Sequence, residues 1–146
     1  MSDGKQFWDR EYKNAEYFSL SERPAEDLLK FGRYLERESG RQFLNPTVNI
    51  LDLGCGNGRN LIYLAQTYGC HGTGYDISEV AIKQAKIVAQ GLPLRSRKGE
   101  SLNFVARSIA GKLDLSDSSV DIVLDMMASH YLPLADRTFL LKEIVR

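Results

Sequence analysis

The stretch 48-VNILDLGCGNGRNLIYLAQTY-68 decides the fold. Its first six residues, Val48 to Leu53, form a short apolar run rich in strand-favouring residues. Glycines follow at once, and after them Leu61, Leu64 and Ala65 recur at helical spacing. A strand, a tight turn and a helix are therefore predicted. Glycines let such a turn bend sharply and approach a ligand, because they lack a Cβ atom, and the position between strand and helix favours a ligand-binding loop.

The same alternation of strand and helix continues toward the C-terminus. The further elements are, in order, a strand over Gly72–Asp76, a helix that Ser78 caps and that buries Ala81, Ala85, Val88 and Ala89, strands over Asn103–Ser108 and Val120–Met126, and a helix that carries Leu140, Leu141 and Ile144. This order predicts the α/β class: a doubly wound parallel sheet with right-handed crossovers and helices on both faces.

Two helices are predicted before the sheet. Trp8, Tyr12 and Ala15 recur at helical spacing among charged residues, which favours a short helix with an aromatic face. A second helix starts near Pro24, a residue tolerated in a first helical turn, and stops at Ser39–Gly40. The leucines on one face of this helix are Leu28, Leu29 and Leu35. We expect an N-terminal helical lid segment over residues 1–45 and the sheet domain over residues 46–146.

Composition limits the class of protein. The 146 residues suffice for one domain, and 19 basic side chains balance 19 acidic ones, so no general attraction to nucleic acid or an anionic membrane is expected. Cys55 and Cys70 fall in no zinc or redox spacing, and we predict two free thiols in a reducing compartment. No leader or membrane-length apolar run is visible. We expect a soluble, cytoplasmic protein.

A basic loop is predicted at 91-GLPLRSRKGES-101. Its basic residues Arg95, Arg97 and Lys98 can contact a phosphate, but three basic residues in a loop are more often simply solvated. We favour the solvated interpretation.

The spacing around the glycine loop bears on its ligand. A dinucleotide fingerprint needs G-x-G-x-x-G, but the third position is Arg59 and glycine arrives one residue early, at Gly58. Asp52 would also repel a pyrophosphate. Asp76 stands near the distance at which such folds place a ribose-binding carboxylate, which indicates an adenosine with free hydroxyls. These residues favour a nucleoside with a cationic tail, such as S-adenosylmethionine, and disfavour a nucleotide-linked oxidoreductase.

Three segments resemble motifs of class I S-adenosylmethionine-dependent methyltransferases. ILDLGCGNG is similar to their first motif, GYDIS to their second, and SVDIVLDMMASHYL to the strand that passes under the transferred methyl group. The three occur in the family's order with suitable spacing, and the resemblance runs from about Val48 to the end. It implies a Rossmann-like fold, methyltransferase activity, and S-adenosylmethionine as cofactor with S-adenosylhomocysteine as product.

The resemblance also implies which residues hold the cofactor. Asp52 and the backbone of Gly54–Gly56 would hold the methionine part, Asp76 the ribose hydroxyls, and Ile77 would pack on the adenine. Cys55 lies within that glycine loop, where we expect a small residue that fits the turn and no catalytic role.

The adenine edge and the lid are less specified. Many relatives end the third strand in an acidic residue, whereas this chain has Ser108 and Ile109 there. The Ser108 hydroxyl, or backbone groups of Ile109 and Ala110, are the candidates for contacting the adenine. The segment 7-FWDREY-12 is similar to a lid that some small-molecule members lay over the cofactor, which would bring Trp8 or Tyr12 near the sulfonium.

A further group of candidates follows the fourth strand, where open parallel sheets place their ligands. It contains Asp125, a cofactor-binding candidate, together with His130 and Tyr131. His130 is a weak catalytic candidate, because a lone histidine in an apolar setting is more often structural. Methyl transfer to a nucleophilic atom needs mainly alignment, so the resemblance requires no catalytic residue. We assign His71 no role.

The sequence limits the chemical class of the methyl acceptor only in part. The tetrapeptide that marks methylation of amino groups on bases and glutamine, an Asn, Asp or Ser before two prolines and an aromatic residue, is absent after the fourth strand, where DMMASHY stands. A small-molecule acceptor is favoured; lipids remain open, and RNA is open but unsupported by the charge.

In the family, the helix that ends in LLKEIVR leads into three further strands, whereas this sequence ends at Arg146. A sheet of order 3-2-1-4 with an open edge at the fourth strand is therefore expected, either in a truncated chain or in a natural short form. Because an open apolar edge favours pairing, we expect homodimers through it. The alternative to an enzyme is a non-catalytic S-adenosylmethionine-binding or interaction module, and the lesser alternative is an oxidoreductase.

Overall fold

The computed structural model describes residues 2–18, 20–39, 43–92 and 102–146. The four strands of its parallel sheet are β1 (Asn49–Leu53), β2 (His71–Asp76), β3 (Leu102–Ala106) and β4 (Ile122–Asp125). They lie in the order β3-β2-β1-β4. Ile50 of β1 stands opposite Gly72 of β2 and Ile122 of β4. The predicted α/β class and strand order are confirmed.

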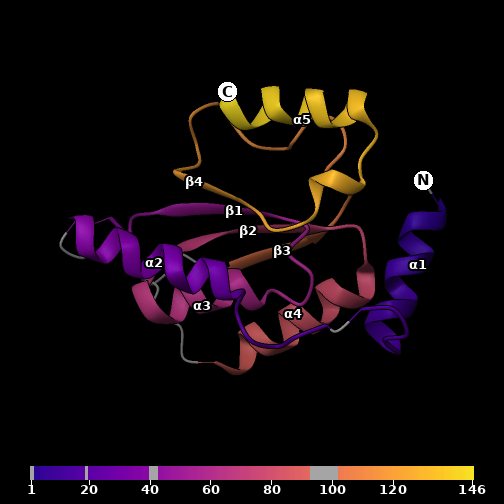
Figure 1. The fold of residues 1–146 in the computed structure, drawn as a ribbon, viewed down its shortest axis with the longest axis horizontal. Coiled ribbons are helices and arrows are strands. Elements are labelled where there is room, and N and C mark those ends of the chain that lie inside the picture. Colours follow the sequence, from indigo (N-terminus) through magenta and orange to yellow (C-terminus); the bar gives the residue numbers. More distant parts are fainter. Residues whose placement is uncertain (1, 19, 40–42, 93–101) are drawn as a thin grey trace.

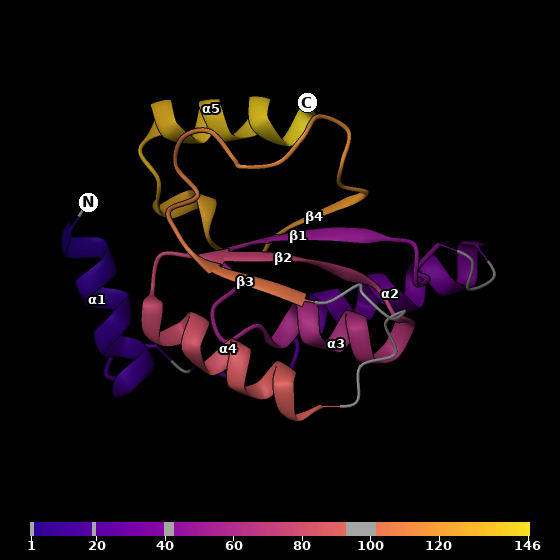
Figure 2. The ribbon, with the colours of Figure 1, turned by 180° about the vertical axis from the view of Figure 1, so that it is seen from behind.

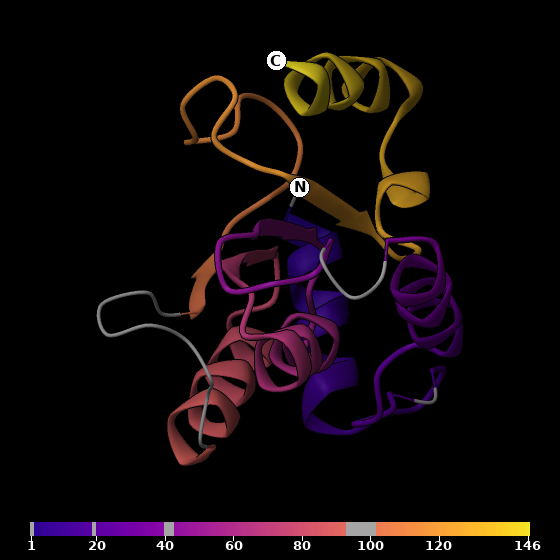
Figure 3. The ribbon, with the colours of Figure 1, turned by 90° about the vertical axis from the view of Figure 1, so that its left-hand side faces the viewer.

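Helices cover both faces of this sheet (Figure 1). The helices are α1 (Ser2–Lys13), α2 (Glu26–Ser39), α3 (Arg59–Tyr68), α4 (Glu79–Gly91) and α5 (Leu134–Val145). Helices α2, α3 and α4 lie on one side and α5 lies alone on the other, while α1 stands at the end toward which the strands run (Figure 2). Seen from the side, the sheet separates α5 from the other layer (Figure 3).

The central strand β1 supplies side chains to two cores, because successive residues of a strand point to opposite faces. Ile50 packs with Leu61 of α3 on one face, whereas Leu51 and Leu53 pack with Leu140 of α5 on the other. Both faces of β1 are therefore buried, which explains why apolar residues occupy both faces of the strand.

Helix α1 ends at Lys13, so Ala15 lies beyond the helix in which the spacing places it. The Glu11 carboxylate, only 3% exposed, accepts hydrogen bonds from the backbone N–H groups of Tyr17 (3.0 Å) and Phe18 (3.1 Å). This side chain turns the backbone away from the helix axis, and no periodic pattern reveals such a contact.

Two strands are shorter than predicted. β3 ends at Ala106, two residues before the predicted end, because the chain turns where the Ser108 hydroxyl accepts from the Ala110 N–H at 3.0 Å. β4 spans only Ile122–Asp125 within the predicted Val120–Met126.

Helix α4 confirms the predicted cap: the Ser78 hydroxyl accepts from the backbone N–H of Ala81 at 3.1 Å. The predicted burial of Val88 is wrong, because this side chain is 45% exposed. The row that faces the core runs through Ala81, Ala85 and Ala89 at intervals of four residues, and Val88 lies beside that row.

Within the described part of the chain, no helix is both long enough and apolar enough to cross a bilayer. Gly91, where the sequence predicts the basic loop to begin, is the last residue of α4. The basic residues Arg95, Arg97 and Lys98 lie outside the described residues.

Candidate cofactor-binding site

A pocket of about 430 Å³ lies where the strands end, within the size range of small-molecule sites. Side chains from α1, the segment after it, the glycine loop and the turns after β2, β3 and β4 line it. The predicted cofactor-binding residues among them are Tyr12, Gly54, Cys55, Gly56, Asp76, Ile77, Ser108 and Ile109. Residues that lie far apart in the sequence are thus brought together around one cavity.

Four predicted residues are not part of the lining: Asp52, Ala110, Asp125 and His130. Asp52 lies on β1, just before the glycine loop, and is 1% exposed. His130 is exposed, and only its neighbour Tyr131 lines the pocket. The functional roles of these four residues stay predictions.

The glycine loop needs its glycines for two reasons. Gly54, Gly56 and Gly58 have positive φ angles of 70°, 55° and 78°, which other residues adopt at a cost. In addition, a Cβ atom on Gly54 would overlap the Ala128 side chain, and one on Gly56 would overlap the Tyr12 hydroxyl. The loop backbone therefore lies in direct contact with Tyr12 of α1 and with Ala128 in the turn after β4.

Asp76, at the end of β2, is 8% exposed and joins this loop to the start of α4. One carboxylate oxygen accepts from the Gly56 N–H and the other from the Ser78 N–H, each at 2.8 Å. Burial raises the pKa of Asp76, and these N–H groups partly oppose the rise. Each oxygen retains a second lone pair, so the carboxylate can also accept from ligand hydroxyls.

Asp52 is a buried carboxyl that is only partly compensated by hydrogen bonds or opposite charge. Its Oδ2 atom has no hydrogen-bond partner within the described part of the chain. Burial chiefly, together with repulsion from Asp76, raises its pKa to about 7, while Arg59 acts in the opposite direction. Because an unpaired buried carboxylate is costly, this position favours a ligand that brings a positive charge nearby.

The thiols are buried, and burial raises their pKa values, to about 11 for Cys70 and well above the usual value for Cys55. Such thiols are poor nucleophiles. The expectation that Cys55 fits the turn without taking part in catalysis stays a prediction.

Helix α1 is held over the pocket by polar contacts to α4. The Asp9 carboxylate accepts from the Ser78 hydroxyl at 2.7 Å and from the Val80 N–H at 3.2 Å. Gln84 donates to the Tyr12 carbonyl at 2.8 Å. Because Ser78 also donates its backbone N–H to Asp76, the position of α1 is linked directly to the pocket floor.

Three aromatic rings from three segments form a wall of the pocket: Trp8 of α1, Phe18 of the following segment and Tyr131 of the short 3-10 helix η1 (Ser129–Tyr131). Ring centroids lie 5.1 Å apart for Trp8 and Phe18, and 5.5 Å apart for Trp8 and Tyr131. We call these three residues the aromatic wall. Trp8 and Tyr12, the predicted lid residues, both line the cavity.

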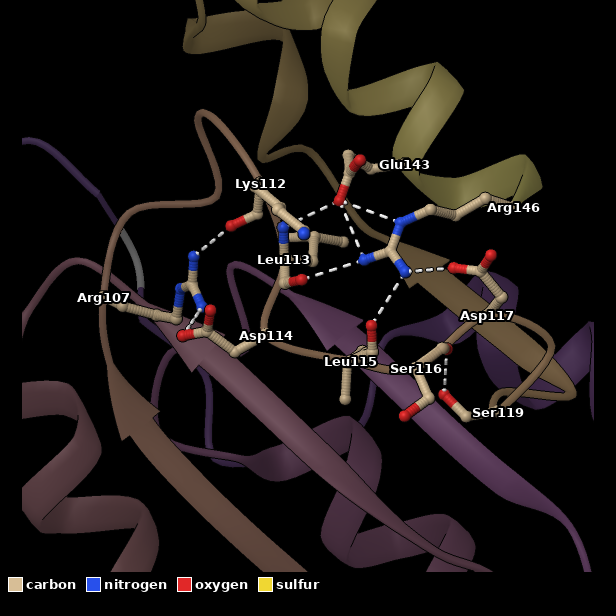
Figure 4. A network of polar contacts seen from close by, with 10 residues as sticks. All are labelled: Arg107, Lys112, Leu113, Asp114, Leu115, Ser116, Asp117, Ser119, Glu143 and Arg146. Carbon is tan, nitrogen blue, oxygen red and sulfur yellow. Dashed lines mark hydrogen bonds and ion pairs between the residues drawn. The ribbon is translucent and has the colours of Figure 1, made fainter.

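Arg107 shapes the loop after β3, which carries Ser108 and Ile109. Its guanidinium lies 4.8 Å from the centre of the Tyr75 ring, donates to the Lys112 carbonyl at 2.6 Å and pairs with Asp114 at 2.6 Å (Figure 4). This one side chain therefore spans the loop and fixes its path beside the pocket.

The far end of the same loop is fastened to α5 (Figure 4). Arg146 donates to the carbonyls of Leu113 (2.9 Å) and Leu115 (2.8 Å), and the Glu143 carboxylate accepts from the Leu113 N–H at 2.9 Å. Glu143 and Arg146 also pair with each other at 2.9 Å.

Sequence reasoning missed the residues that hold the N-terminal segment on the rest of the domain. Asp9 meets Ser78 across 69 positions of the chain, and the buried Asn60 accepts from the Ala25 N–H across 35 positions. Their only signal is a polar side chain within an amphipathic pattern, which names no partner.

Comparison with known proteins identifies the family of this chain. Residues 50–146 match the methyltransferase domain family, which is more than half of the chain. The chain belongs to this methyltransferase domain family. The predicted family resemblance is confirmed.

This methyltransferase domain is 32% identical over 133 residues to a glycine/sarcosine/dimethylglycine N-methyltransferase of Actinopolyspora halophila, covering 89% of the chain and 22% of that protein. It is 27% identical to a chloroplastic tocopherol O-methyltransferase of Arabidopsis thaliana, covering 85% of the chain and 32% of that protein. The chain thus spans between a fifth and a third of the length of these two relatives.

Solved structures agree with the Rossmann-like fold. An S-adenosylmethionine-dependent methyltransferase from Geobacter sulfurreducens, in complex with S-adenosylhomocysteine, superposes with a TM-score of 0.66 at 26% identity, covering 96% of the chain and 51% of that protein. A second, from Thiobacillus denitrificans with the same ligand, gives 0.64 at 26% identity, covering 93% and 50%. The domain therefore has the fold of S-adenosylmethionine-dependent methyltransferases.

Proposed function

We propose that this domain binds S-adenosylmethionine in the pocket and transfers its methyl group to a small-molecule acceptor, leaving S-adenosylhomocysteine. The observation that carries the proposal is the glycine loop, which lies between two buried carboxyls, Asp52 and Asp76. One accepts hydrogen bonds beside the loop, and the other favours a nearby positive charge. The S-adenosylhomocysteine held by both similar structures supports this choice of ligand.

Each part of the cofactor meets suitable chemistry. Asp76 accepts the ribose hydroxyls through its remaining lone pairs. The backbone of Gly54–Gly56 contacts the methionine part, whose cationic groups are attracted to Asp52 just before the loop. Ile77 and Ile109 provide apolar contact for the adenine. S-adenosylmethionine supplies the electrophilic methyl group.

The adenine edge and the lid complete the cofactor assignment. The Ser108 hydroxyl lines the pocket and contacts the adenine edge, and the Ala110 N–H, which donates to that hydroxyl, holds it in place. Tyr12 covers the glycine loop, and Trp8 places an aromatic ring toward the sulfonium.

The residues of this chain contribute mainly alignment and exclusion of water. Methyl transfer to a nucleophilic atom requires the acceptor in line with the methyl group, and the acceptor's proton can leave to water. No general base is needed for this step. His130 is exposed and lies outside the lining, and it remains only a weak catalytic candidate.

A small-molecule acceptor is favoured because the names of two relatives give small molecules as their substrates. The balance of acidic and basic residues offers no support for RNA. The proposal includes a cytoplasmic location, from the few buried thiols, and a homodimer formed through β4.

Calorimetric titration of S-adenosylmethionine and S-adenosylhomocysteine tests the cofactor. Asp76→Ala should weaken both affinities at least about tenfold, since it removes the ribose contact and loosens the loop. Asp27→Ala is the matched control, because Asp27 is exposed on α2 and, within the described part of the chain, pairs with Lys30 alone. Failure of the folded wild-type chain to bind either ligand would refute the proposal.

Two further measurements address the alternatives. Turnover of labelled S-adenosylmethionine with a panel of acceptors separates an enzyme from a non-catalytic binding module, which would bind the cofactor without transfer. Titration of nicotinamide and flavin cofactors tests the oxidoreductase alternative, for which we expect no binding.

A further inference from the structure

The pocket surface beyond the glycine loop and the residues assigned to the ribose and adenine is mostly apolar. The side chains concerned are Trp8, Phe18, Leu20, Met126, Tyr131 and Leu132. They come from the lid segment and from the turn after β4, which face each other where Trp8 meets Tyr131. This surface is where an acceptor can approach the methyl group.

Charged lining residues are few, and both already make hydrogen bonds within the protein. Asp76 holds the N–H groups of Gly56 and Ser78. Arg59 donates to the carbonyl of Arg23 at 3.1 Å, which ties it to the segment before α2. Among the described lining residues no other side chain is charged. A charged acceptor would therefore lose hydration and find little opposite charge in the lining, which is costly.

The aromatic wall favours a flat partner. Trp8 contacts both other rings, yet Tyr131 remains 53% exposed and Phe18 38% exposed, so ring surface is left for a ligand. Aromatic rings bury a large apolar area and pack with other rings edge-to-face or offset. The adjacent Met126 can adapt to the outline of such a ring.

The turn after β4 is held in a strained shape beside this wall. Met127 has a φ angle of 72°, which is unusual for a residue other than glycine. The Asp125 carboxylate holds it there by accepting from the N–H groups of Ala128 (3.2 Å) and Ser129 (3.0 Å). Strain that the surrounding contacts maintain in this way is concentrated at ligand-binding sites.

We propose that the methyl acceptor is an uncharged molecule that carries its nucleophilic atom on a flat aromatic ring, as a phenol does. This inference rests on the proposed function and names the substrate class of the same site. The ring packs against the aromatic wall, and its hydroxyl points toward the methyl group. The oxygen forms a bond to the methyl carbon, the carbon–sulfur bond breaks with its electron pair going to sulfur, and the phenolic proton leaves to water.

Three phenols that differ mainly in charge test this assignment: 4-methylphenol is neutral, tyramine is cationic and 4-hydroxyphenylacetate is anionic. Trp8 is the chain's only tryptophan, so its indole N–H signal in NMR reports binding at the aromatic wall without ambiguity. With S-adenosylhomocysteine present, 4-methylphenol should shift this signal at a concentration at least tenfold lower than either charged phenol. Equal or tighter binding of a charged phenol, or of glycine, would overturn the proposal.

Variants locate the site. Tyr131→Leu removes a ring but keeps an apolar side chain, and it should weaken 4-methylphenol binding several-fold and more than it weakens S-adenosylhomocysteine binding. Tyr34→Leu is the matched control, because Tyr34 is similarly exposed, on α2, and does not line the pocket. Equal effects of the two variants would overturn the proposal.

A wrong assignment of the acceptor can be distinguished from a wrong assignment of the cofactor. Calorimetry reports S-adenosylhomocysteine binding independently, and 4-methylphenol is also titrated into the chain alone. A chain that binds S-adenosylhomocysteine but shows no Trp8 shift with 4-methylphenol retains the proposed function and refutes the phenol-type acceptor. A Trp8 shift without S-adenosylhomocysteine binding supports the ring site and refutes the cofactor.

Discussion

The carboxyl of Asp52 is protonated in the folded protein at a pH where the unfolded chain has released its proton. Burial chiefly, with repulsion from Asp76, raises its folded pKa from 3.8 to about 7. Between these two values the folded state binds more protons than the unfolded state, so stability falls as pH rises. The contribution is complete below about pH 4 and is lost as pH rises through 7.

Asp52→Asn should therefore stabilise the protein at high pH, because it keeps the shape of the side chain without its charge. We expect a gain in the free energy of unfolding of up to about 4 kcal/mol at pH 8, and little gain at pH 4. Urea unfolding at both pH values measures it, with the exposed Asp27→Asn as control. The same dependence on pH in wild type and variant would contradict the raised pKa.

Gly56 and Tyr12 should be energetically coupled. Gly56→Ala places a Cβ atom on the Tyr12 hydroxyl at a backbone φ of 55°, so we expect destabilisation of a few kcal/mol. Tyr12→Phe should relieve part of this cost, since it removes the overlapping oxygen. Urea unfolding of the single and double variants should give a coupling free energy above about 0.5 kcal/mol. Strict additivity would show that α1 does not lie on the loop.

At the scale of elements, Asp9 joins α1 to the first turn of α4. Asp9→Ala removes the acceptor for the Val80 N–H and the Ser78 hydroxyl, and we expect a loss of about 1 kcal/mol in the free energy of unfolding. Because α1 carries Trp8, the tryptophan fluorescence of the folded variant should also shift to longer wavelength. Asp27→Ala should do neither, as Asp27 pairs only on its own helix among the described residues.

We expect Arg107 to fix the conformation of the loop after β3, and Arg37 provides a matched control. Arg107→Ala should weaken S-adenosylhomocysteine binding several-fold, because the backbone of Ser108 and Ile109 loses its anchor. Arg37 also lies over a tyrosine ring, at 5.6 Å, and pairs with an acid, but on the exposed surface of α2. Calorimetry on Arg107→Ala and Arg37→Ala should show a loss only in the first; equal affinities would contradict the role of the anchor.

At the scale of the whole molecule, β4 lies at an edge of the sheet in the described part of the chain. Beside it, α5 exposes apolar side chains: Leu134 is 75%, Leu141 59% and Val145 86% exposed. An unpaired strand edge next to such a helix favours association. Light scattering at micromolar concentration should give about twice the 16.5 kDa of one chain, and a monomeric mass would contradict the homodimer.

Local patterns determined much of this molecule. The apolar run of Val48–Leu53, the glycines after it and the helical spacing beyond them predict strand, loop and helix, because side-chain period and glycine's backbone freedom act over a few residues. The resemblance carried by the same motifs predicted the strand order. The pocket residues Asp76 and Ile77 follow from the end of β2, since parallel strands end together at one edge.

Only the tertiary structure decided what encloses the pocket. Asp9 accepts a hydrogen bond from Ser78, and Asn60 accepts one from Ala25. The Tyr12 hydroxyl lies against Gly56. The two residues of each pair are far apart in the chain. Such contacts carry no period, because a polar side chain on a helix surface is compatible with solvent as much as with a partner. Which of the two it meets depends on how the elements pack, and packing is settled by the whole core at once.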